Sequence, residues 1–300
     1  MREGAWDTVE MAQSLNRTAG RVEALAALNL SGADAIGFAQ RVCANDVATL
    51  APGDWQWNCL LSPQGRVLAL FRLWRRASDI LTLVLPAFAL PATLVLLKRY
   101  VLRSKLVVEV ADIVLVGGSS LSLTPAGATM HSSDGRWLAL AEAGDPGLAD
   151  ACDVSEYWRT QDLACGVPWL DPEALETFTA QALSLDRLEA FSVRKGCYPG
   201  QEIVARMHFL GQNKRELRRF ASARDVGAGT PVCATGPVPR TLGTVVAVVQ
   251  GPAGTEILAV LQHAAGDAQL FAGAACDVPL TSLSFNAPPL PAALPPLDKA

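Results

Sequence analysis

One cysteine lies in a stretch of the chain that is unusually rich in glycine, proline and charged residues. Cys197 lies within residues 194–206, RKGCYPGQEIVAR, where cations flank it on both sides. A cysteine reacts as its thiolate, and nearby cations or a helix N-terminus lower its pKa from about 8.5. If the backbone is extended here, the Lys195 ammonium lies on the same face as the sulfur. The pattern predicts a reactive thiol, and a buried, inert cysteine is the alternative.

Glycine and proline restrict the backbone around this thiol. Gly196 and Gly200 permit backbone angles or close approaches that a side chain forbids. The proline before Gly200 fixes its own φ and suits the first turn of a helix. We therefore expect a strand ending near Lys195, a tight turn that carries the cysteine, and a short helix over 199–206.

The overall composition is that of a folded chain of 300 residues. Half of the residues are apolar and 18% are charged, so the chain can bury a core. A net charge of -4 provides no overall attraction to nucleic acid. The basic run 214–219 is explained more simply as a solvated strand face. The seven cysteines are scattered singly, which argues against a disulfide framework and favours a reducing compartment.

One apolar run approaches the length of a membrane span. Residues 80–97 carry no charge, and about 20 apolar residues cross a bilayer as a helix. Pro86 and Pro91 divide the run into a strand, a loop and the start of a helix. We therefore expect a buried strand–turn–helix and no membrane association. Residues 1–7 contain no apolar signal core.

Hydrophobic periodicity predicts strands alternating with covering helices over the first two thirds of the chain. Helices are predicted over 35–43, 91–103, 154–163 and 172–179, and strands over 58–61, 66–74, 79–85, 105–110, 113–116, 120–123 and 137–142. This alternation indicates an α+β fold. Later, short β-prone runs separated by glycine and proline predict a small β-barrel. These runs cover 216–220, 243–249, 256–261 and 275–278.

The same patterns divide the chain into successive segments. Residues 1–16 are polar and expected to be flexible, and 17–211 form an α+β core. We expect two lobes in that core, about 17–110 and 111–211. A C-terminal β-barrel follows over 212–285, and a proline-rich tail over 286–300 is expected to be disordered.

The segment 194–206 closely resembles the signature of the YgfZ family, Lys-Gly-Cys-Tyr-x-Gly-Gln-Glu followed by Ile-Val-Ala-Arg. These are folate-binding proteins related to the aminomethyltransferase, or T-protein, of the glycine cleavage system. Similar segments occur at 45–47, 62–67 and 97–105, and the resemblance covers roughly residues 20 to 285. At 180–186 the chain departs from the family's Pro-Gln-x-x-Asn-Leu-Asp, with Ala180 and Ser184 in place of Pro and Asn.

The resemblance implies a two-lobed aminomethyltransferase-like core that binds tetrahydrofolate or a related folate. It implies a cytoplasmic accessory role in assembling or repairing iron–sulfur enzymes, including those that modify tRNA. The partners would be folate and iron–sulfur client or assembly proteins, with no direct contact to nucleic acid expected. Cys197 maps to the essential, catalytic cysteine. The cofactor-binding residues implied are Lys195, Gly196, Tyr198, Gly200, Gln201, Glu202 and Arg206.

Several of these side chains also have a structural interpretation, which the sequence leaves open. Glu202 can accept hydrogen bonds from a pterin-like ring, or it can form an i,i+4 ion pair with Arg206. Tyr198 can stack on a pterin or pack in the core. Lys195 and Arg206 can pair with a folate glutamate tail, or Lys195 can simply be solvated. Trp55 and Trp57 are interpreted as packing residues.

Two other functions remain open, and so does the question of whether the chain is an enzyme. One is a folate-dependent aminomethyltransferase or demethylase of the T-protein type. Those enzymes use an aspartate shortly after a central strand, whereas residues 80–106 contain no acid here. Acid–base help would have to come from elsewhere. The other is a thiol-dependent hydrolase, which needs a histidine beside Cys197; His208 is the nearest in sequence.

Overall fold

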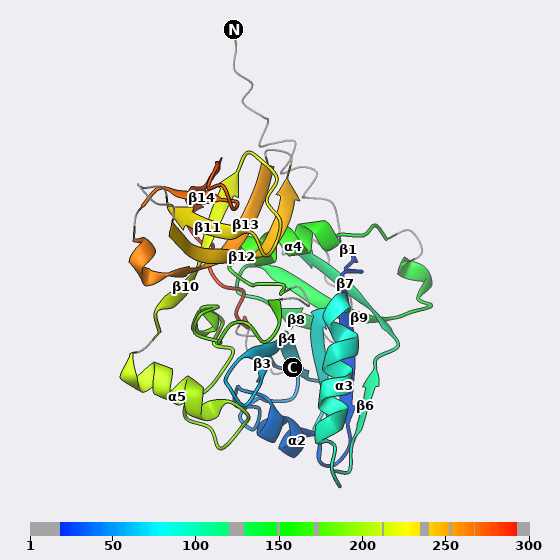
Figure 1. Ribbon diagram of the computed structural model, residues 1–300. Helices are drawn as coiled ribbons and strands as arrows, with labels where there is room; N and C mark the ends of the chain where they lie inside the picture. The colour runs from blue at the N-terminus through cyan, green and yellow to red at the C-terminus, as the bar shows by residue number, and fades with distance from the viewer. Residues whose placement is uncertain are drawn as a thin grey trace.

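The computed structural model describes residues 19–119, 129–148, 151–170, 174–211, 213–234, 240–251, 254–266 and 268–292. Within these residues the chain forms three antiparallel sheets with helices packed against them (Figure 1). The predicted flexible segment 1–16 lies outside the described residues. None of the described helices combines the length and apolar character that crossing a membrane requires.

A five-stranded sheet forms the first layer, in the order β3-β4-β5-β2-β6. Its strands are β2 (Leu25–Ser31), β3 (Trp55–Leu61), β4 (Val67–Arg75), β5 (Ile80–Pro86) and β6 (Val107–Val110). Two helices, α2 (Ala35–Val42) and α3 (Leu90–Tyr100), cover one face through a shared apolar cluster. The predicted hairpin at 62–65 is confirmed by the pairing of β3 with β4.

The apolar run 80–97 forms a strand, a short turn and a helix, as predicted. β5 is followed by the 3-10 turn η1 (Ala87–Ala89) and then by α3. The helix ends three residues earlier than the sequence indicated. Arg103 has a left-handed φ of 58°, a conformation that an α-helix cannot contain.

A four-stranded sheet follows, in the order β1-β7-β9-β8. Its strands are β1 (Gly20–Arg21), β7 (Ile113–Ser119), β8 (Thr129–His131) and β9 (Arg136–Glu142), and η2 (Pro146–Leu148) comes after them. The helix α4 (Ser155–Ala164) packs on this sheet. Gly117 is needed there because a Cβ would collide with the Trp158 indole. The predicted strand at 120–123 lies outside the described residues.

The predicted α-helix over 172–179 is wrong in its described part, since residue 174 is in a 3-10 turn, residues 175–177 form turns and residue 178 is a bend. Val67, at the start of β4, explains the difference. Its N–H donates to the carbonyl of Phe178, and its carbonyl accepts from the N–H of Glu176. These bonds to β4 take the place of helical ones. A short 3-10 helix, η4 (Leu185–Leu188), follows.

The third sheet has seven strands and closes almost completely into a barrel. Its order is β15-β14-β11-β12-β13-β10-β16, and its two edge strands are consecutive in the chain. The strands are β10 (Arg215–Ser222), β11 (Pro231–Ala234), β12 (Arg240–Gly251), β13 (Gly254–Gln262), β14 (Leu270–Ala272), β15 (Val278–Pro279) and β16 (Thr281–Leu283), with η5 (His263–Ala265) between β13 and β14. The predicted strand at 275–278 begins only at Val278.

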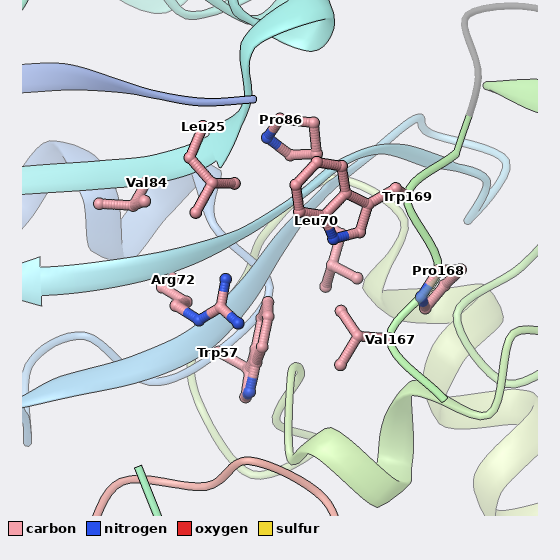
Figure 2. A pocket seen from close by; sticks show the side chains of 9 residues that line it. All are labelled: Leu25, Trp57, Leu70, Arg72, Val84, Pro86, Val167, Pro168 and Trp169. Atoms are coloured by element: carbon pink, nitrogen blue, oxygen red, sulfur yellow. The ribbon is translucent and has the colours of Figure 1, made fainter. Parts of the chain in front are cut away.

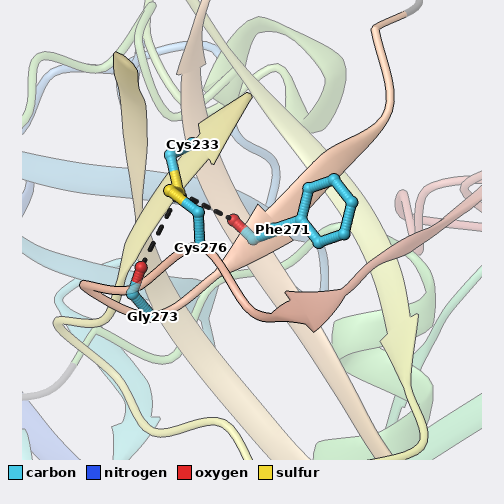
Figure 3. Close-up of a disulfide and its surroundings, with 4 residues drawn as sticks. All are labelled: Cys233, Phe271, Gly273 and Cys276. Carbon is cyan, nitrogen blue, oxygen red and sulfur yellow. Dashed lines mark hydrogen bonds between the residues drawn. A yellow bond between two sulfur atoms is a disulfide. The ribbon is translucent and has the colours of Figure 1, made fainter. Parts of the chain in front are cut away.

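Two of the seven cysteines are paired, although the sequence argued against a disulfide framework. Cys233, on β11, forms a disulfide with Cys276, in the turn before β15 (Figure 3). Their sequence separation of 43 residues hides this pairing from any spacing pattern. The bridge is a single cross-link inside the barrel and not a framework, and the other five cysteines are free.

The C-terminal segment also differs from expectation, because residues 286–292 are held in place. The indole N–H of Trp57 donates to the carbonyl of Pro289 at 2.8 Å, and the N–H of Ala292 donates to the carbonyl of His131 at 3.0 Å. Proline-rich composition predicted disorder over 286–300, but these contacts order its first part. Residues 293–300 lie outside the described residues.

Candidate functional site

The cysteine loop occupies residues 193–200 and leads into α5 (Gln201–Leu210). The predicted strand ending near Lys195 is wrong, because residues 193–196 form a bend. The hydroxyl of Ser192 accepts hydrogen bonds from the N–H groups of Arg194, at 3.2 Å, and Lys195, at 3.3 Å. Such a side-chain-closed turn competes with extended backbone. The helix after the loop is confirmed and extends four residues beyond the predicted end at Arg206.

Lys195 points into the protein and not toward the thiol. Its ammonium donates to the carbonyls of Cys43, at 2.7 Å, and Asn45, at 2.8 Å, and the residue is only 6% exposed. Burial lowers the pKa of Lys195 below its ordinary value. The expected placement of the ammonium beside Cys197 is therefore wrong: the lysine fastens the loop to the segment after α2.

Tyr198 and Gln201 brace the same loop from within. The Tyr198 hydroxyl donates to the carbonyl of Ser192 at 2.9 Å, and its ring is buried in the main apolar cluster. The Gln201 side chain donates to the carbonyl of Lys195 at 3.0 Å. The Lys195 ammonium lies 5.2 Å from the centre of the Tyr198 ring. The core-packing interpretation of Tyr198 is confirmed.

The two glycines of the loop have different roles. Gly200 has a φ of +80°, and a Cβ there would lie 2.6 Å from the carbonyl oxygen of Ser62 and 2.9 Å from the Cα of Gly65. It allows the loop to lie directly on the β3–β4 hairpin. A Cβ at Gly196 would meet nothing within 4 Å. The space in front of Gly196 is open to an approaching molecule.

Cys197 is exposed, so the alternative of a buried cysteine is wrong, and its reactivity stays a prediction. Its neighbours Lys195 and Tyr198 are buried, which presents the thiol on a firmly held turn. Other free thiols lie in the core of the protein. Burial raises the pKa of Cys43 to about 12 and that of Cys165 to about 11.

Glu202 and Arg206 form a surface ion pair. Their side chains meet at 2.7 Å with i,i+4 spacing and are 81% and 51% exposed. This confirms the helix salt-bridge interpretation, and such pairs contribute about 0.3–0.5 kcal/mol. The exposed end of α5 carries His208, whose ring packs edge-on against Phe209 with centroids 5.0 Å apart.

A hollow lies between the five-stranded sheet and the segment that follows α4 (Figure 2). It is lined by Leu25, Trp57, Leu70, Arg72, Val84, Pro86, Val167, Pro168 and Trp169. Its free volume is about 10 Å³, roughly that of one water-sized sphere. No residue of 194–206 lines it.

A buried charge cluster adjoins the hollow. Asp162 pairs with Arg72 and with Arg136 at 2.9 Å each, and its second oxygen accepts from the Trp169 indole at 2.9 Å. Burial alone would raise the pKa of Asp162, but the two guanidinium groups hold it below its ordinary value. The carboxylate is therefore ionised at neutral pH.

The two arginines retain donors that nothing in the described part of the chain accepts. Nε of Arg72 and Nη2 of Arg136 are buried without a hydrogen-bond partner among the described residues. Arg72 stacks over Trp57 at 4.3 Å from the ring centre, and Arg136 over Trp158 at 4.5 Å. Buried donors without partners are costly, so they suit a site that receives acceptor atoms from a ligand.

Sequence reasoning did not identify this cluster. One signal was present: Arg72 is a charge in the middle of β4, whose other residues before the terminal Arg75 are apolar. Its partner Asp162 lies 90 residues later, on α4, so only the fold brings the two together. Trp55 and Trp57 are both buried, which confirms that they pack, and Trp57 also forms a wall of the hollow.

Asn45 connects the cysteine loop to the hollow. Its carbonyl accepts from the Lys195 ammonium at 2.8 Å. Its side-chain amide donates to the carbonyl of Trp57 at 3.0 Å. A lysine of the loop and the backbone of Trp57 thus share one asparagine, although the loop and the hollow are distinct places on the molecule.

The fold of this chain is similar to that of a solved aminomethyltransferase, which defines its fold class. The glycine cleavage system aminomethyltransferase T from Bartonella henselae superposes with a TM-score of 0.72, covering 94% of this chain and 90% of that one, at 14% identity. At that identity the similarity establishes the fold: a T-protein-like architecture of mixed helix and sheet with a barrel-like C-terminal sheet. No family model matches the chain.

Sequence relatives define the family. An uncharacterized protein of Haemophilus influenzae is 32% identical over 197 residues, which are 64% of this chain and 69% of that protein. The tRNA-modifying protein YgfZ of Vibrio atlanticus is 29% identical over 213 residues, 64% of this chain and 66% of that one. The chain thus spans about two thirds of the length of these relatives. It belongs to the YgfZ family.

Proposed function

We propose that this chain is a tetrahydrofolate-binding accessory protein that supports the assembly or repair of iron–sulfur enzymes, including enzymes that modify tRNA. The observation that carries the proposal is the exposed Cys197 on a loop braced by buried Lys195 and Tyr198. A firm turn that holds an exposed thiol in one place suits a thiol that reacts with a partner molecule. The relatives named tRNA-modifying protein support the choice of client.

Cys197 is the reacting group in this proposal, and its neighbours position it. The side chains of Lys195, Tyr198 and Gln201 are committed to contacts within the protein, and Gly200 is covered by the β3–β4 hairpin. These residues therefore hold the loop in shape, and none of them lines the hollow that we propose for folate below. The open space at Gly196 admits the partner molecule to the thiol.

The hollow beside Arg72 is the place we propose for the folate ring system. Trp57 and Trp169 offer indole rings against which a planar heterocycle can stack. Arg72 lines the hollow, and its partnerless Nε–H matches the oxygen and nitrogen acceptors of a pterin. These residues fit the group in chemistry, but the free volume of about 10 Å³ does not admit it. One of the indoles must turn when folate binds.

We place this activity in the cytoplasm, where iron–sulfur clients would be met. Thiols are kept reduced there, which suits a function that depends on the free Cys197. In such a compartment we expect Cys233 and Cys276 to be present as neighbouring thiols of the barrel for much of the time.

A complementation experiment tests the role of the thiol. Cells that lack the protein receive wild type, Cys197→Ala or the control Cys152→Ala, and an iron–sulfur-dependent tRNA modification is quantified. Cys152 is also an exposed free cysteine but lies outside the loop. We expect loss of the modification with Cys197→Ala alone, at unchanged protein level. Full rescue by Cys197→Ala would overturn the proposal.

The T-protein fold favours one alternative, a folate-dependent aminomethyltransferase or demethylase. The absence of an acid over residues 80–106 counts against it. The assay that separates the two is tetrahydrofolate-dependent release of a one-carbon unit from methylated amines. Turnover that persists in Cys197→Ala would establish the alternative and remove the thiol from the chemistry.

A further inference from the structure

The last described residues pass between the sheets and hold a wall of the hollow. After β16 the chain leaves the barrel, and residues 286–292 run past the end of α4 toward β3 and the β8–β9 turn. The Trp57 indole N–H donates to the carbonyl of Pro289, and both groups are buried. In Figure 2 this indole nitrogen points away from the other lining side chains. One face of Trp57 thus closes the hollow while its edge is tied to the tail.

Residues of the β8–β9 turn form hydrogen bonds with the same segment. The N–H of Ser133 donates to the carbonyl of Leu290 at 2.7 Å, and its hydroxyl donates to the carbonyl of Pro288 at 3.1 Å. The carbonyl of His131 accepts both the N–H of Ala292, at 3.0 Å, and the indole N–H of Trp55, at 2.9 Å. Because Trp55 packs edge-on against Trp57, both indoles are fixed with the tail.

The base of the segment is anchored separately. The ring of Phe285 lies 4.0 Å from the guanidinium carbon of Arg187, over the backbone at Gly166. The N–H of Asn286 donates to the carbonyl of Ala164, the last residue of α4, at 2.9 Å. Phe285 therefore marks a fixed end from which residues 286–292 extend.

We propose that residues 286–292 are an intramolecular strap that keeps the hollow closed by holding Trp57, and that its release opens the hollow to the ligand. The inference deepens the proposed function and rests on it for the identity of the ligand. The strap is suited to release. Three of its seven residues, Pro288, Pro289 and Pro291, have no N–H to donate. It is held by scattered hydrogen bonds, one isolated bridge between Ser132 and Pro291 and the packing of Leu290 on the main apolar cluster, without a sheet ladder or a covalent link.

The central experiment removes the strap from the full chain. A stop codon after Phe285 leaves the anchor in place, and tetrahydrofolate is titrated into both proteins. We expect the shortened chain to bind at least tenfold more tightly, because the full chain must first release the strap. A synthetic peptide of residues 286–300, added in excess, should restore the weaker binding. Equal affinity of the two proteins would overturn the inference.

A milder variant covers the case in which the shortened chain does not fold. Ser133→Ala deletes the hydroxyl that bonds Pro288 and accepts from the N–H of Leu290, and it leaves the hollow intact. We expect tighter tetrahydrofolate binding, by about threefold or more. The control is Ser78→Ala, at an exposed serine in the β4–β5 turn. Equal affinity of the two serine variants would contradict the strap.

A second readout separates the strap from the identity of the ligand. The ¹⁵N signal of the Trp57 indole, assigned by its loss in Trp57→Phe, reports exchange of the bonded N–H with solvent. We expect slow exchange in the full chain and fast exchange in the shortened one. If exchange is faster in the shortened chain but neither protein binds tetrahydrofolate, the strap is supported and the proposal of folate binding is refuted. If exchange is the same in both, the strap is disproved whatever binds.

Discussion

The ammonium of Lys195 donates a 2.7 Å hydrogen bond to the carbonyl of Cys43, 152 residues earlier in the chain. A second bond, to the carbonyl of Asn45, completes the attachment. The lysine next to the exposed thiol is therefore a structural support that joins the loop to the end of α2. This changes how the signature residues are interpreted: the side chains of Lys195, Tyr198 and Gln201 hold the loop on which the thiol is exposed.

Replacing Lys195 tests this support directly. We expect Lys195→Met to lower the free energy of unfolding by about 1–3 kcal/mol, because two carbonyls lose their shared donor inside the protein. Urea unfolding measures the change. The control is Lys98→Met on the exposed side of α3, expected to lie within about 0.5 kcal/mol of wild type. Equal stability of the two variants would show that the buried contacts contribute nothing.

The two loop glycines provide a matched pair. Gly200→Ala should cost at least about 2 kcal/mol, because φ is +80° and the new Cβ would lie 2.6 Å from the carbonyl of Ser62. Gly196→Ala should leave the unfolding free energy within about 0.5 kcal/mol, since its Cβ would meet open space. Thermal or urea unfolding of both proteins decides the point. Similar losses would mean that the loop does not rest on the hairpin as described.

The sequence predicted the regular elements of the fold more reliably than its irregular ones. The helix over 35–43 and the hairpin at 62–65 follow from local periodicity and turn residues, and both are present. The errors arise where a distant partner decides the backbone. The segment predicted as a helix over 172–179 pairs instead with Val67, more than a hundred residues earlier.

In the candidate site, too, features set by the local sequence could be predicted, whereas features set by distant residues could not. The exposure of Cys197 and the left-handed Gly200 could be anticipated from cysteine among glycines and proline. The direction of Lys195 could not, because the Ser192 hydroxyl closes a turn where alternation indicated a strand. The buried pair of Arg72 and Asp162 spans 90 residues, and no local pattern joins such residues.

Removing the acidic residue should affect stability very differently at the buried Asp162 and at the exposed Glu202. Asp162→Ala leaves the buried Arg72 without its paired carboxylate, while Arg136 keeps only its pair with Asp134, and we expect a loss of about 3–5 kcal/mol. Glu202→Ala breaks the exposed pair with Arg206 and should cost no more than about 0.5 kcal/mol. Unfolding at low and high salt measures both. A loss below about 1 kcal/mol for Asp162→Ala would refute the buried cluster.

The buried thiols should make stability fall at alkaline pH. Burial raises the pKa of Cys43 from 9.0 to about 12, although the nearby Lys195 partly offsets this effect. The unfolded chain releases the thiol proton near pH 9 while the folded chain retains it. The stability contributed by this difference is fully present below about pH 9 and is lost as the pH rises toward about 12.

Cys43→Ala isolates that contribution. Between pH 9 and 10.5, we expect its free energy of unfolding to decline less steeply with pH than that of wild type. The exposed Cys152 supplies the control, since Cys152→Ala should keep the wild-type slope. Lys195 acts in the opposite direction, because burial lowers its pKa and its cost is relieved as the pH rises. If Cys43→Ala instead kept the wild-type slope, the Cys43 thiol would have to ionise as readily in the folded chain as in the unfolded one.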